Sequence, residues 1–145
     1  MAIRVNGTRM YYPSQSYPTG AQASISFFIK PNRHGDDHVL SKTVVSAWYF
    51  YLSYYSLKCT WVYQTLNDVF ANTTLTSGVT SHIVMTFNNG QYKLYNNGSL
   101  VSTQNNPSYP YIKYGTDGIF FGGDSADVEL DDIGFWQGYV LTLED

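Results

Sequence analysis

The sequence predicts an all-β domain in which two antiparallel sheets form a sandwich, and three observations carry this prediction. First, Asn-Asn-Gly occurs twice, eight residues apart, between short runs of β-branched and aromatic residues. Second, many short runs of strand-like composition are separated by turn residues. Third, no segment keeps a helical period. The length of 145 residues suits one domain over residues 1–145.

The first third of the chain supplies strands whose apolar residues alternate with polar ones. In SISFFIK, Ile25, Phe27 and Ile29 share one face, whereas Ser24, Ser26, Phe28 and Lys30 share the other. Pro31 ends this strand. The expected elements are strands over 2–5, 24–30 and 39–45, a loop over 13–22 and a polar turn over 31–38.

Two aromatic strands follow, and both of their faces are apolar. They are expected over residues 46–52 and 57–64, around a turn at 53–56. Strands that are apolar on both faces are typical of the centre of a sheet. Residues 67–78 read as irregular.

The two Asn-Asn-Gly turns then predict a three-stranded meander over 82–87, 91–95 and 99–103. After a loop over 105–117, the last strands are expected over 118–121 and 127–136. In the final strand, Val128 and Leu130 are out of phase with Ile133 and Phe135, which predicts a bulge at Asp131–Asp132. Residues 141–145 read as a helical turn or a tail.

The composition favours contact with sugars or proteins. Fourteen residues are tyrosines and only 13% are charged, so a nucleic-acid partner is not expected. Apolar runs are too short for membrane insertion. All eight Lys and Arg residues precede position 114, whereas eight of the eleven acids follow it. These acids either lie solvated at turns, hold a cation or contact a neighbouring molecule.

An ordered set of motifs resembles the laminin G-like, concanavalin A-like jelly-roll domains. The motifs are SISFFIKP, VLSK, the strand from Trp48, HIVMTFNNGQYKLYNNGSLV, IFFGG, ELDDIGFW and LTLED, in that order over residues 24–145. The resemblance implies a jelly-roll sandwich. Such domains serve as lectins, adhesion modules, enzymes and viral structural parts, so the fold alone does not name the function.

No catalytic residues are predicted. Glu129 and Asp131 resemble the first half of a laminarinase-type motif, but Ile133 and Gly134 stand where its acid/base glutamate is expected. The three histidines have no metal-ligand spacing. A glycoside hydrolase therefore remains the lesser alternative.

The resemblance implies calcium as the one candidate cofactor, because many laminin G-like domains hold one Ca²⁺ near the rim of a sheet. The candidate ligands are Asp124, Asp127 and Asp132, since calcium prefers carboxylate and carbonyl oxygens. The alternative is that Asp132 accepts backbone hydrogen bonds from a neighbouring loop.

The candidate sugar site is a tyrosine cluster on the aromatic strands. Aromatic ring faces accept the C–H side of a pyranose, while nearby polar groups bind its hydroxyls. The residues are Tyr49, Tyr51, Tyr54, Tyr55 and Asn72.

Together these observations predict a non-catalytic carbohydrate-binding or adhesion module on a virion or extracellular surface. The alternative is a bacteriophage virion structural protein, a head decoration or fibre domain, that acts through contacts with neighbouring subunits. The partners would be a glycan or neighbouring protein subunits in a homo-oligomer or larger assembly.

Overall fold

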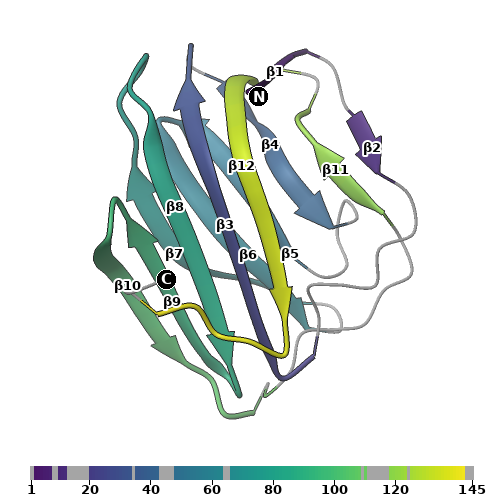
Figure 1. Cartoon of the computed structure of the whole chain (residues 1–145), viewed down its shortest axis with the longest axis vertical. Coiled ribbons are helices and arrows are strands. Elements are labelled where there is room, and N and C mark those ends of the chain that lie inside the picture. The colour runs from purple at the N-terminus through teal and green to yellow at the C-terminus, as the bar shows by residue number, and fades with distance from the viewer. Residues whose placement is uncertain are drawn as a thin grey trace.

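Two antiparallel sheets lie face to face in the part of the chain that the structure, a computed structural model, describes (Figure 1). That part comprises residues 2–7, 10–12, 20–33, 35–42, 48–63, 66–108, 110, 118–123 and 125–142, with the backbone alone at 35, 38, 42, 61–63 and 66–70. This arrangement confirms the predicted all-β sandwich. None of the described segments is a helix long and apolar enough to cross a membrane.

The first sheet has the strand order β1-β12-β3-β8-β9-β10. Its strands are β1 (Ile3–Asn6), β3 (Gln22–Pro31), β8 (Ser81–Asn88), β9 (Gln91–Asn96), β10 (Ser99–Asn105) and β12 (Asp127–Gln137). Strand β12 inserts between β1 and β3, so the acidic end of the chain lies against its basic beginning.

The second sheet has the order β2-β11-β4-β5-β6-β7. Its strands are β2 (Met10–Tyr12), β4 (Gly35–Lys42), β5 (Trp48–Tyr54), β6 (Ser56–Tyr63), β7 (Leu66–Thr74) and β11 (Ile119–Phe121). The aromatic strands β5 and β6 both lie inside this sheet, as their composition predicted.

The core lies between the sheets and is built from alternate residues of each strand. In β3, Ile25, Phe27 and Ile29 are fully buried, and Phe27 meets Phe50 of β5 edge to face with ring centroids 4.8 Å apart. Because side chains alternate across a strand, the residues between them point away from the core. This outer face of the first sheet carries the site described below.

Both Asn-Gly turns have the predicted conformation. Asn89, Gly90, Asn97 and Gly98 all have positive φ, as a two-residue type I′ turn requires. The three strands β8, β9 and β10 are consecutive neighbours, which confirms the meander.

The predicted bulge in β12 is also present. The register of β12 against β3 shifts between Asp131 and Gly134, and Asp132 has a φ of +45°. The shift brings Phe135 back to the core side, where its ring lies 5.8 Å from that of Trp48.

Three elements differ from the predictions. Strand β4 begins at Gly35, inside the expected polar turn, and its expected end at 45 lies outside the described residues. Residues 67–74, expected to be irregular, belong to β7, and the short edge strand β2 was not expected. Leu141 and Thr142 form no helical turn, while 143–145 lie outside the described residues.

Candidate functional site

The outer face of the first sheet is partly covered by the chain itself. After β12, residues 138–142, here called the C-terminal segment, cross in front of β8 and β9 (Figure 1). The Ser24 hydroxyl donates to the carbonyl oxygen of Tyr139 at 3.1 Å and accepts from the backbone N–H of Leu141 at 2.9 Å. Ser24 is therefore fully buried although it points away from the core.

A cavity of about 300 Å³ lies between this segment and the sheet. Its floor is a stacked pair from neighbouring strands: Phe28 of β3 and His82 of β8 stand opposite each other with ring centroids 4.5 Å apart and planes 18° apart. Tyr95 of β9 and Trp136 of β12 add further aromatic surface. We call this site the aromatic cavity; its wall includes Ser26, Phe28, His82, Tyr95, Asp132 and Trp136.

The β12 bulge places Trp136 at the cavity. Gly134 lies on the same outer face, and a Cβ at this position would overlap the Trp136 ring. The ring therefore lies over the backbone of β12 at Gly134, and the absence of a side chain there provides its space. Asp132, in the left-handed conformation within the bulge, also lines the cavity.

Polar groups stand beside the rings. The His82 Nε2 atom lies 2.7 Å from the Ser26 hydroxyl oxygen, and the His82 backbone N–H donates to Asn97 Oδ1 at 2.8 Å. The contact with Ser26 orients the imidazole that stacks on Phe28, and the bond to Asn97 anchors the His82 backbone. Among the described residues in the cavity wall, Asp132 is the one carboxylate. Glycoside hydrolases ordinarily use a pair of carboxyl groups.

The predicted tyrosine cluster lies on the other sheet. Tyr49 and Tyr51 are half-buried on the outer face of β5, and Tyr51 stands opposite Lys58, which stands opposite Asn72 of β7. Tyr54 and Tyr55 form the turn between β5 and β6. The structure thus brings Tyr49, Tyr51 and Asn72 to one face, with the two turn tyrosines at its end. We call this surface the tyrosine face.

Burial raises the pKa of Tyr51, and the nearby carboxylates Asp36 and Asp37 and the Tyr49 hydroxyl raise it further. Its phenol is therefore protonated and able to donate a hydrogen bond at neutral pH.

The candidate calcium ligands are not gathered into one site among the described residues. Asp124 lies outside them. Asp127 begins β12, and Asp132 is five residues further along, about 16 Å for an extended strand. The described residues contain no group of three or more His, Cys, Asp or Glu side chains that could hold a metal ion. Calcium binding stays a prediction.

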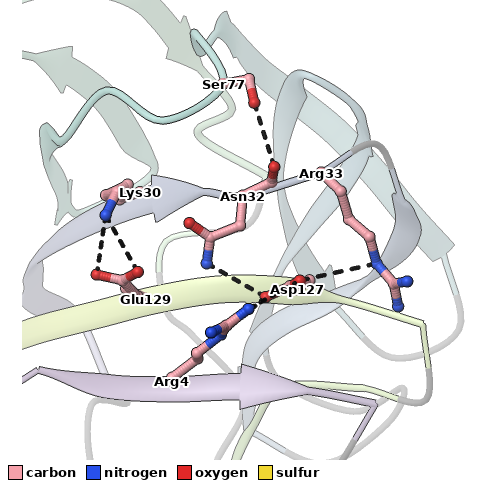
Figure 2. A network of polar contacts seen from close by, with 7 residues as sticks. All are labelled: Arg4, Lys30, Asn32, Arg33, Ser77, Asp127 and Glu129. Carbon is pink, nitrogen blue, oxygen red and sulfur yellow. Dashed lines mark hydrogen bonds and ion pairs between the residues drawn. The ribbon is translucent and has the colours of Figure 1, made fainter.

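Asp127 instead takes part in a polar network (Figure 2). Its carboxylate accepts hydrogen bonds from Arg4 Nε at 3.3 Å and Asn32 Nδ2 at 3.2 Å, and Arg33 Nε lies 3.9 Å away. The hydrogen bond from Arg4 lowers the pKa of Asp127. Basic residues from the start of the chain thus meet an acid from its end within the same molecule.

The partial hydrolase motif also takes part in such pairing. Lys30 Nζ donates to both carboxylate oxygens of Glu129, at 3.1 and 3.2 Å (Figure 2). Ile133, at an expected acid/base position, packs against the core.

Sequence reasoning placed Phe28 and Ser26 on the outer face but did not single out the aromatic cavity. The predicted bulge was the sequence signal that could have located the cavity, because it turns Trp136 to the outer face. Phe28, an apolar residue on the same outer face, was the second signal. The LTLED motif begins in the C-terminal segment that closes the cavity, but it gives no indication that this segment returns across the sheet.

Comparisons with known proteins agree with this fold. A family model described as the concanavalin A-like lectin/glucanases superfamily matches residues 6–145. By sequence, no curated protein matches the chain.

Among solved structures, the binding domain of Paraclostridial Mosquitocidal Protein 1 is similar, with a TM-score of 0.80 and 16% identity over 99% of this chain and 41% of that one. The binding domain of Botulinum Neurotoxin DC in complex with SialylT gives 0.71 and 16% over 86% and 34%. The same domain in complex with rat synaptotagmin II gives 0.68 and 16% over 85% and 33%. The chain thus spans 33–41% of the length of these solved chains, and such identities show the fold alone.

Proposed function

Because the chain belongs to the concanavalin A-like lectin/glucanase superfamily, we propose that it is a non-catalytic carbohydrate-binding module whose sugar occupies the aromatic cavity. The observation that carries this proposal is the cavity's wall. Phe28, Tyr95 and Trp136 supply aromatic surface beside the polar groups of Ser26, His82 and Asp132. Ring surface next to hydrogen-bonding groups suits a pyranose, which is apolar on its C–H faces and polar at its edges.

The size and shape of the cavity support a small ligand. Ligand sites in proteins usually measure about 300–1,000 Å³, and this cavity stands at the lower end of that range. The bulge and the hydrogen bonds of His82 hold its walls in place before a ligand arrives, which limits the entropy lost on binding.

The placement of the carboxylates favours a binding role for the cavity over glycoside hydrolysis. Asp132 is the sole described carboxylate at the cavity, and Glu129 is engaged by Lys30. The similar solved structures are binding domains, and one of them was solved with SialylT. This likeness supports a general binding role for this chain.

The tyrosine face is the second candidate position for the same function. Tyr54 is 65% exposed, and Tyr49, Tyr51 and Asn72 share one outer face. It lies on the opposite side of the sandwich, so the two positions can be tested separately.

A glycan array followed by titration calorimetry tests the proposal. We expect saturable binding to at least one glycan, and we expect Trp136→Ala to weaken it about tenfold or more because a ring platform is lost. Tyr51→Ala, the matched control on the tyrosine face, should leave affinity unchanged. Loss of binding in Tyr51→Ala alone would move the site to the tyrosine face.

Native mass measurement covers the remaining alternative. A stable oligomer that binds no glycan on the array would overturn the proposal and favour a structural role through subunit contacts. The virion or extracellular setting stays a prediction.

A further inference from the structure

A second, more polar cavity lies beside the aromatic cavity on the same outer face. Its volume is about 450 Å³, and Tyr95, Leu141 and Thr142 line both cavities. The C-terminal segment thus forms a shared wall. The remaining lining residues include Thr86 and Asn88 of β8 and Gln91 and Lys93 of β9. We call this site the polar cavity.

Strand register explains why these polar side chains gather here. Thr86 stands opposite Lys93, and Asn88 stands opposite Gln91, all on the outer face of the first sheet. The Asn88 side-chain oxygen accepts from Gln22 Nε2 at 3.1 Å and from Asn89 Nδ2 at 3.0 Å. These bonds orient the Asn88 amide so that its NH₂ group remains as a donor.

Lys93 gives the polar cavity its charge. Residues 81–105, which comprise β8, β9 and β10, contain no Asp or Glu and a single Lys. None of the ion pairs among the described residues involves Lys93. On these three strands, an anion bound beside the Lys93 ammonium would therefore meet no carboxylate.

We propose that the polar cavity is a second subsite, which binds an anionic substituent on a sugar unit next to the one in the aromatic cavity. This inference rests on the proposed function. The ligand class is then an acidic oligosaccharide of at least two units, carrying a carboxylate or a sulfate. Lys93 and Tyr95 lie two residues apart on one face of β9, about 7 Å along the strand. One glycosidic linkage can bridge that spacing.

Calorimetry with matched disaccharides tests this subsite on the full chain. The series contains a neutral disaccharide, its uronic acid counterpart and its sulfated counterpart. We expect the acidic ligands to bind about tenfold more tightly than the neutral one at low salt, because a hydrogen bond from an ammonium to an anion is stronger than a neutral one. Raising the salt concentration should reduce this preference. Comparison of the two acidic ligands identifies which anion is preferred.

Lys93→Met removes the charge and keeps the length of the side chain. We expect it to abolish the preference for acidic ligands while the neutral disaccharide binds as before. Lys58→Met, on the tyrosine face, is the matched control and should change neither affinity. Equal binding of all three ligands with no effect of Lys93→Met would overturn the second subsite alone. Failure of every ligand to bind would overturn the proposed function with it.

Discussion

At the scale of single residues, Asp127 shows how this charge-poor chain uses its charges. Asp127 is 7% exposed, although its partners Arg4 and Arg33 are largely in solvent. A carboxylate this buried is costly unless it is paired and hydrogen-bonded. Arg4 and Asn32 supply those bonds, and they join β1, β3 and β12 at one end of the first sheet.

This pairing predicts a pH dependence of stability. The hydrogen bond from Arg4 lowers the pKa of folded Asp127, whereas the unfolded group titrates near its ordinary value of about 3.9. The stabilisation that the paired Asp127 carboxylate contributes to the folded state is therefore present above about pH 4. It is lost as the pH falls through the folded pKa. Asp127→Asn should cost about 1 kcal/mol of unfolding free energy at neutral pH, since its partners are exposed, and almost nothing in strong acid.

Urea denaturation of both proteins at neutral and at acidic pH measures this difference. Arg4→Met should reproduce the same pH-dependent loss, because it removes the group that lowers the pKa. A cost of Asp127→Asn that is the same at every pH would contradict the assignment.

At the scale of elements, the sequence was informative wherever alternation was regular. The phase change between Val128 and Phe135 revealed the β12 bulge, and the two Asn-Gly turns revealed the meander. In β7 the register against β6 shifts between Ala71 and Val69, so the strand holds an extra residue. The extra residue interrupts the alternation of apolar and polar residues in β7. Because the strand also contains many polar residues, its sequence did not predict a strand. Strand β2 has only three residues, too few to show a period.

The two Asn-Asn-Gly turns are identical in sequence but not in surroundings, and this predicts different responses to the same substitution. Gly90 and Gly98 have similar φ values of +86° and +76°. A Cβ at Gly90 would overlap the carbonyl oxygen of Asn106, whereas one at Gly98 would meet open space. Gly90→Ala should therefore cost about 1–3 kcal/mol more than Gly98→Ala, which carries only the backbone strain.

Denaturant unfolding of the two variants provides the measurement, and each serves as the control for the other. Equal losses of stability would mean that the loop at Asn106 moves away without cost. The sequence alone gives no basis for this difference, because it arises from the hydrogen bond that brings Asn106 against the Gly90 turn.

At the scale of the whole molecule, the candidate site depends on a contact between distant parts of the chain. The predictions assigned ligand binding to the tyrosine face because its aromatic residues cluster on two neighbouring strands and the turn between them. The aromatic cavity draws Phe28, Tyr95 and Trp136 from three strands and closes only when residues 138–142 return across the sheet. No local pattern encodes such a return, so composition could suggest sugar binding but could not locate this cavity.

The Ser24 hydroxyl holds the C-terminal segment against the first sheet, and a substitution of Ser24 therefore tests whether the cavities depend on this contact. Its buried hydroxyl bonds both Tyr139 and Leu141, so Ser24→Ala leaves a carbonyl and an N–H without this partner. We expect a loss of about 1–3 kcal/mol in unfolding free energy. We also expect faster amide exchange at residues 139–142 and weaker ligand binding, because Leu141 and Thr142 wall both cavities.

Ser77→Ala is the matched control, since the Ser77 hydroxyl donates one hydrogen bond, to the Asn32 carbonyl, at an exposed position. It should leave exchange at residues 139–142 unchanged. If Ser24→Ala lowers stability but leaves exchange and affinity as in the unsubstituted chain, other contacts hold the segment. The cavities would then be a fixed property of the sandwich and would not depend on this hydroxyl.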